Sequence, residues 1–376
     1  MRVVFFLGAG FSKPAGFPLM REFRSFAQNL PGYEEEKRCL WGAIQYTQRA
    51  CAYIQGDIYN IEDIMSALSL THAIDRKRIL IFEGKPVKAE DAAEHLATLV
   101  WRTYLRIHDA HALHRTYAKL FRAVRLFRRD PVNRLDIVTT NYDMLPEILL
   151  SATGDGPAAP AGPEMRIADA SDGTNGSIYA GPGEQILHKL HGSVNWFRRR
   201  GKAPEVYYDD RVGKQIDVGV PAQPCPVSWC AEHGEKLPEK FRPLIAPPSF
   251  LKTYKPGVIQ TAWNGAEEAI RKANRLIFIG YSFPPSDTIM RFFLGNALAG
   301  NRPGCAITVI DRNTKAVMNS LRTILVRSIT DHYVDTIEAD IEEMIGKQGI
   351  FENQHEFANY LRDMTRKAGH LKPRRQ

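Results

Sequence analysis

Four short segments of this chain combine the residue types that nucleotide chemistry requires. They are G-A-G-F-S at 8–12, T-T-N-Y-D at 139–143, K-L-H-G-S at 189–193 and I-G-Y-S-F-P-P-S-D at 279–287. Glycines let a backbone approach a phosphate closely, and the free amides of a following helix then face its negative charge. An amide, an imidazole and carboxylates in the other segments could orient a water molecule and transfer a proton.

The glycine spacing of the first segment differs from that of one large class of nucleotide-dependent enzymes. Gly8, Gly10 and Gly16 form G-x-G-x5-G, whereas dinucleotide-dependent dehydrogenases carry G-x-G-x-x-G. The segment therefore predicts a dinucleotide without ordinary hydride transfer. Taken alone, such a turn is also typical of plain strand-turn-helix structure.

The elements that position these segments follow from the apolar patterns around them. Short apolar runs, which are typical of buried strands, occupy 3–7, 135–139, 186–190, 276–280 and 306–311. Helical spacing occurs at 19–30, 61–70, 89–107, 257–274 and 287–298. This series predicts an α/β fold, a Rossmann-like parallel sheet with helices on both faces. The four segments would then meet at the carboxyl edge of the sheet.

The chain is expected to contain one large domain and a shorter extension. Residues 1–313 would form the catalytic domain, with a helical insertion at about 31–130 and loop-rich insertions at about 151–183 and 200–255. Residues 314–376 would form a C-terminal helical extension with a basic tail, in which 340–345 and 355–366 are the clearer helices.

Composition limits the protein class. The chain has 376 residues, 44% hydrophobic content and no apolar run of membrane-spanning length or signal-peptide pattern, so we expect a cytoplasmic globular protein. Five cysteines, an odd number, favour reduced thiols. The net charge of +8 is concentrated partly at 115–134 and at the C-terminus. Direct nucleic-acid binding stays open, because solvated helix faces and a disordered tail explain these patches equally well.

Together and in this order, the four segments resemble the motifs of the sirtuin family. The closer resemblance is to bacterial sirtuin-like proteins that consume NAD in anti-phage defence, and it spans about residues 4–313, although the helical insertion contributes little. The resemblance implies that His191 and Asn141 are the catalytic residues. It also implies that the pyrophosphate and adjacent ribose of NAD are lined by Gly8, Ala9, Gly10 and Ser12.

The same resemblance assigns the remaining positions. Asp143 would lie beside the nicotinamide carboxamide, and Gly280 and Ser282 would contact the adenosine half. Asp287 would support that loop, and Asp311 would bind the adenine ribose through its hydroxyls.

Simpler roles for the same side chains stay open. His191 could be a turn histidine satisfied by backbone groups, and Asn141 an ordinary strand-end residue. Asp143 could cap a helix beginning near Met144, and Ser282 could stabilise a turn. As a catalytic group, His191 could accept a proton at cellular pH, since free imidazole titrates near pH 6.5.

Departures from the deacylating sirtuins bear on the function. Residues 16–21 read G-F-P-L-M-R, and they lack the Asp-Phe pair of the G-I-P-D-F-R sequence that deacylating sirtuins carry. Residues 242–249 stand where those enzymes carry an F-G-E sequence that helps to receive the acyl-lysine peptide. The second departure puts the peptide-binding slot in doubt. Two C-x-x-C zinc pairs are replaced by three possible ligands at unusual spacing, so no metal is expected there. These ligands are Cys225, Cys230 and His233. Histidines at 108, 111 and 114 rotate around a helix and are expected to be structural.

Three functions remain after this comparison of motifs. The leading interpretation is an NAD glycohydrolase, splitting NAD into nicotinamide and ADP-ribose, as an anti-phage effector. The alternatives are an NAD-dependent protein deacylase and a non-catalytic NAD or ADP-ribose-binding subunit. The resemblance further implies a homo-oligomer with a sensor or activator partner, either a hexameric DNA-translocase-type ATPase, which we prefer, or an Argonaute-like protein.

Overall fold

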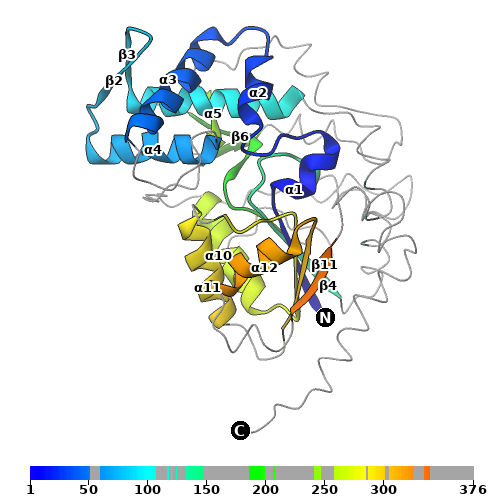
Figure 1. Cartoon of the computed structure of the whole chain (residues 1–376). Coiled ribbons are helices and arrows are strands. Elements are labelled where there is room, and N and C mark those ends of the chain that lie inside the picture. Colours follow the sequence, from blue (N-terminus) through cyan, green and yellow to red (C-terminus); the bar gives the residue numbers. More distant parts are fainter. Residues whose placement is uncertain are drawn as a thin grey trace.

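A six-stranded parallel sheet lies at the centre of the protein (Figure 1). The structure is a computed structural model, and it describes residues 1–50, 60–106, 117, 120, 124, 133–146, 186–199, 206–208, 241–246, 258–284, 287–300, 305–324 and 334–338. Within these residues the strands are β1 (Arg2–Leu7), β4 (Arg134–Thr139), β5 (Ile186–Lys189), β9 (Arg275–Ile279), β10 (Ala306–Asp311) and β11 (Val334–Glu338). The sheet confirms the predicted α/β fold.

The strand order places a ligand-binding edge beside the first strand. The order is β11-β10-β9-β1-β4-β5, so the chain runs outward from β1 to β4 and β5, returns to the other side of β1, and runs outward again. This is the 3-2-1-4-5-6 order of Rossmann folds, whose direction reverses between the two central strands. Here that point lies between β1 and β9. Ligands of such sheets bind outside the carboxyl ends of the strands.

Both faces of the sheet are covered, as the continuous apolar strands predict. Alternate residues of β1 enter two separate buried clusters, with Val3, Phe5 and Leu7 in one and Val4 and Phe6 in the other. The second cluster is completed by α10 (Val258–Arg271), α11 (Thr288–Ala299) and α12 (Thr314–Arg322). The first extends into the helices that follow β1.

The segment between β1 and β4 is built mainly of helices, and these lie beyond the carboxyl ends of the strands (Figure 1). They are α2 (Phe23–Gln28), α3 (Glu34–Ala50), α4 (Ile61–Ile74) and α5 (Ala89–Arg106). A hairpin that the sequence analysis does not predict, β2 (Ile79–Phe82) and β3 (Lys85–Lys88), separates α4 from α5. Its turn uses Glu83 and Gly84, both at positive φ.

Other elements differ from the sequence-based expectations. Helix α1 (Ala9–Ser12) and the 3-10 turn η1 (Lys13–Ala15) follow β1 directly, and the helix predicted at 19–30 is confined to α2. A second, antiparallel sheet has the order β7-β6-β8, from β7 (Val206–Tyr208), β6 (Gly192–Arg199) and β8 (Phe241–Ile245). Strand β11 lies in the segment for which only helices are predicted.

Several sequence predictions concern residues outside the described part of the chain. These are the loop-rich insertion at 151–183, most of the one at 200–255, the histidines at 108, 111 and 114, the cysteines at 225 and 230 with His233, and the basic tail. No helix among the described residues has the length and apolar character needed to span a bilayer.

Candidate functional site

Two glycine turns meet at the point where the strand order reverses. The backbone N–H of Gly8 donates to Ile279 O at 3.0 Å, and that of Gly10 donates to Gly280 O at 2.9 Å. A Cβ atom on Gly8 would lie 2.5 Å from Gly280 O, and one on Gly280 would lie 2.3 Å from Phe11 N. Gly280 also has φ of 62°, a conformation that side chains disfavour. The turns after β1 and β9 are therefore packed backbone against backbone.

This packing accounts for the backbone N–H groups of the two glycines in the first turn. The N–H groups of Gly8 and Gly10 donate across to β9 and its turn, and Phe11 N–H donates to Gly8 O at 2.9 Å. Helix α1, which begins at Ala9, is only four residues long. In this structure Gly8, Gly10 and Gly280 are needed for the close approach of the two turns to each other.

Asn141 joins the end of β4 to the first glycine turn. Its side-chain Nδ2 donates to Gly8 O and to Ser12 Oγ, both at 2.9 Å, and its backbone N–H donates to Thr139 Oγ1 at 3.0 Å. The residue is 5% exposed. Asn141 is thus a cross-link between two strand ends, and its orientation is fixed by the turn it contacts.

Asp143 and Lys189 are two buried charged residues close to Asn141. Lys189 Nζ donates to Asp143 O at 2.5 Å and to Ser193 Oγ at 2.7 Å, so it ties the end of β4 to the turn after β5. The Asp143 carboxylate accepts from Leu145 N–H at 2.9 Å, which is the helix-capping role left open above. Burial raises the pKa of Asp143, while Lys189 and the Ser12 hydroxyl act in the opposite direction.

His191 is buried, and its neighbours include one carboxylate and two aromatic rings. Its side chain is 1% exposed, and Glu62 Oε1, from the first turn of α4, lies 3.7 Å from His191 Nδ1. Tyr142 Oη donates to the same Glu62 oxygen at 3.4 Å. The ring centroids of Tyr142 and Trp263 lie 6.2 Å and 6.3 Å from that of His191. Trp263 Nε1 donates to Leu190 O at 2.8 Å, which fixes it against the same turn.

The glycine after His191 has a steric reason. Gly192 has φ of 84°, and a Cβ atom there would lie 2.0 Å from Leu244 O. Ala246 N–H donates to His191 O at 2.8 Å, so the backbone after β8 lies directly against the histidine turn. The H-G pair therefore brings the small antiparallel sheet close to the imidazole.

The residues predicted to contact the adenosine half lie along the same edge, toward β10. Ser282 is exposed, just after the Gly280 turn. Asp287 caps α11 through Met290 N–H at 3.2 Å and accepts from Tyr281 Oη at 2.9 Å, so both carboxylate oxygens support the loop. Asp311, at the end of β10, accepts from Asn313 N–H at 2.9 Å.

Two further functional candidates, Glu62 and Lys189, are visible only in the structure. Glu62 is an acidic residue in the first turn of an amphipathic helix, where acids are common for reasons of local stability. Lys189 belongs to a motif already quoted, and its complete burial next to the asparagine and histidine segments is visible only in three dimensions. An unusual lysine within an apolar strand was the one available signal.

Comparisons with known proteins gave matches among solved structures. The chain matches no protein-family model and no curated protein. A mutant Sir2 homologue in complex with ADP-ribose has a TM-score of 0.38 and 14% identity, covering 99% of this chain and 94% of that one. Sir2Tm bound to a propionylated peptide has a TM-score of 0.36 and 11% identity, covering 92% of this chain and 90% of that one.

Proposed function

We propose that this protein is an NAD glycohydrolase, which uses water to split NAD into nicotinamide and ADP-ribose. The observation that carries the proposal is the buried His191, whose Nδ1 faces the Glu62 carboxylate at 3.7 Å. It lies beside a strand-end network in which Asn141 contacts Gly8 and Ser12. An imidazole with a carboxylate behind it is a suitable acceptor for one proton.

Hydrolysis of NAD requires few catalytic groups besides such a proton acceptor. When the bond between nicotinamide nitrogen and ribose carbon breaks, its electron pair leaves with the nicotinamide and positive charge develops on the ribose. Water then bonds to that carbon and loses one proton, which His191 would accept before releasing it to solvent. The amide hydrogens of Asn141 are committed to Gly8 O and Ser12 Oγ, so its amide oxygen is the atom available to orient the water.

Glu62 would act through the histidine. A carboxylate near Nδ1 stabilises the protonated imidazole and favours one ring orientation, which leaves Nε2 as the nitrogen directed toward substrate. Tyr142, through its contact with the same carboxylate oxygen, would hold Glu62 in place. We therefore assign Glu62 as a positioning residue for His191.

We also propose a cellular role and a means of control. The resemblance of the four motifs to NAD-consuming defence proteins supports a role in NAD depletion during phage infection. Unregulated NAD hydrolysis would harm the host cell, so activity would be controlled by homo-oligomerisation and by a sensor or activator partner. A hexameric DNA-translocase-type ATPase is the preferred partner class, and an Argonaute-like protein is the other.

The proposal is tested by product analysis of NAD incubated with the full chain, with and without an acetylated peptide. We expect nicotinamide and ADP-ribose without peptide, and turnover lower by about 10²- to 10⁴-fold in His191→Ala and Asn141→Ala. His72→Ala, a partly exposed site on α4, is the matched control. The assay is repeated with the partner protein added.

Three outcomes would contradict the proposal. Turnover that requires the peptide would favour a deacylase. Unchanged NAD cleavage in His191→Ala would remove the assigned base. Protection against phage that persists in His191→Ala would favour the non-catalytic NAD-binding subunit.

A further inference from the structure

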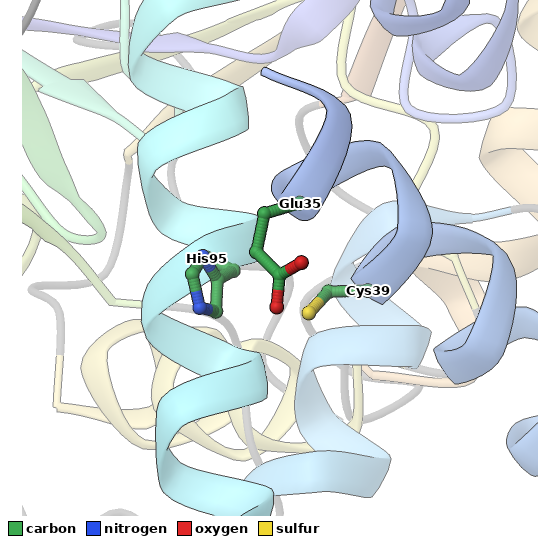
Figure 2. Close-up of side chains that lie close together, drawn as sticks. All are labelled: Glu35, Cys39 and His95. Atoms are coloured by element: carbon green, nitrogen blue, oxygen red, sulfur yellow. The ribbon is translucent and has the colours of Figure 1, made fainter. Parts of the chain in front are cut away.

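A second cluster of reactive side chains lies in the helical segment after β1, between α3 and α5. Glu35 and Cys39 are separated by one turn of α3, and His95 on α5 faces them (Figure 2). One ligand atom from each of the three residues lies within 4.8 Å of the other two. Residues four apart on a helix share a face, so the pair on α3 is presented as a unit toward α5.

The donor set matches one class of metal ion. A thiolate, an imidazole and a carboxylate together suit zinc, which binds them at about 2.0 to 2.3 Å. Around one such ion these atoms would lie roughly 3 to 4 Å from each other. The observed cluster is slightly wider, but Glu35 is exposed and His95 is partly exposed, so their side chains can close around an ion.

A nearby carboxylate supports the same interpretation. Glu36 Oε1 lies 3.4 Å from His95 Nδ1. Histidines that bind metals commonly donate the other ring N–H to a carboxylate, which fixes the tautomer and turns Nε2 toward the ion. Glu36 is placed for this role by its contact with Nδ1 of His95.

The surroundings contain charge of both signs. Arg38 contacts both carboxylate oxygens of Glu35 and donates to Phe82 O at 2.9 Å. A carboxylate has about four lone-pair positions, so Glu35 can keep Arg38 and still bind an ion.

Burial differs among the three side chains of this cluster. Cys39 is fully buried, whereas Glu35 is exposed and His95 is partly exposed. The sulfur would therefore contact an ion from the protein interior, and the other two ligands would contact it from the side of the solvent.

We propose that Glu35, Cys39 and His95 bind one zinc ion that joins α3 to α5, with a water molecule as the fourth ligand. From the sequence no metal is expected, because Cys225, Cys230 and His233 have an unusual spacing for zinc. Helix α4, which carries Glu62, packs against both α3 and α5. A zinc ion here would therefore stiffen the helices that hold Glu62 against His191.

The test is zinc binding by the full-length protein after removal of metal with a chelator. Because Cys225, Cys230 and His233 could bind a separate ion, all proteins carry Cys225→Ser and Cys230→Ser. We expect one zinc per chain by elemental analysis, with affinity weaker by about 100-fold or more in Cys39→Ser and His95→Gln. Glu36→Gln should weaken it by about 10- to 100-fold. Zinc should also raise the melting temperature of the parent protein, but not that of the ligand variants.

Matched controls and a spectroscopic readout complete the test. Cys305→Ser, at the other cysteine described outside a disulfide, and His72→Gln should bind zinc as the parent does. Cobalt in place of zinc should give a thiolate charge-transfer band that Cys39→Ser abolishes. If Cys39→Ser does not fold, His95→Gln and Glu36→Gln decide, since both sites are partly exposed. Absence of zinc from the parent, or equal binding by all variants, would overturn the proposal, whatever the NAD assay shows.

Discussion

Glu62 and His191 come from distant parts of the chain, yet their facing atoms are 3.7 Å apart in a nearly dry setting. Charges interact more strongly away from water, so this carboxylate can affect the proton on the imidazole. The pair is also held from both sides, by Tyr142 on the carboxylate and by Trp263 beside the ring. This arrangement makes Glu62 a residue whose charge, separate from its shape, should matter for catalysis.

Replacing Glu62 by Gln should slow NAD cleavage while leaving the fold intact. We expect kcat to fall by about 10- to 100-fold, less than in His191→Ala, because the histidine itself remains. The acid limb of the profile of kcat/KM against pH should move to lower pH, since the protonated imidazole loses a neighbouring negative charge. Steady-state kinetics from pH 5 to pH 9 measure both effects. Glu267→Gln, on the outer side of α10, is the control, and an unchanged profile in Glu62→Gln would exclude the assigned role.

At the residue scale, the sequence predicts only part of this site. His191, Asn141 and Asp143 can be found because each directly follows an apolar run, and strand ends of a parallel sheet converge. Glu62 has no such signal, since its contact depends on how α4 packs. The contacts between the two glycine turns have no such signal, because the N–H groups of Gly8 and Gly10 pair with β9 and the turn after it. That pairing joins segments with no local relationship in sequence.

At the scale of elements, the two glycine turns are mutually dependent. A Cβ atom on Gly280 would contact backbone atoms of Gly10 and Phe11, and backbone cannot rotate away as a side chain can. The positive φ of Gly280 adds conformational strain to this clash. Glycine there is required for the joint between β1 and β9.

Substituting Gly280 by Ala should therefore destabilise the protein by about 3 kcal/mol. Two other glycines separate the causes. Gly84→Ala has positive φ but open space, and should cost about 1 to 2 kcal/mol. Gly295→Ala, in α11, meets nothing nearer than 3.7 Å and should stabilise by up to about 1 kcal/mol. Urea unfolding of the three variants measures the change in the free energy of unfolding for each. If Gly280→Ala destabilises the protein no more than Gly84→Ala does, the two turns are not tightly packed.

Elements with a strong periodic pattern were predicted and the others were not. The strands at 135–139 and 306–311 and the helices at 61–70 and 257–274 are confirmed within a few residues. The hairpin of β2 and β3 was missed because its strands are four residues long and lie between helical patterns. Strand β11 was missed because its pairing with β10, which makes it the sheet edge, is a tertiary property.

At the scale of the whole molecule, one buried histidine links stability to pH. His188 on β5 is 1% exposed, and within the described part of the chain neither of its ring nitrogens has a hydrogen-bond partner. Burial, with a smaller contribution from Arg2, lowers its pKa from 6.5 to about 3. Between these pH values the unfolded chain binds a proton here that the folded chain does not. The contribution of His188 to the free energy of unfolding therefore falls as the pH falls through this range.

The histidine should contribute a loss of about 2 kcal/mol between pH 7 and pH 5. His188→Leu should remove that part of the pH dependence, whereas His72→Gln should keep it. Urea unfolding at pH 7, 6 and 5 compares the slopes for the three proteins. The same slope in His188→Leu and the parent would mean that His188 is protonated in the folded protein or reached by water.

The placement of β1 at the centre of the sheet also has a consequence during biosynthesis. One of the two neighbours of β1, β9, is made long after it, since Arg2 and its contact Asn274 are 272 positions apart in the chain. At about 5 to 20 residues per second, translation leaves one edge of this apolar strand unpaired for roughly 15 to 50 s. The nascent chain must shield Val3 to Leu7 throughout that interval. Binding by a ribosome-associated chaperone, or transient cover from the helices that follow β1, would meet this need.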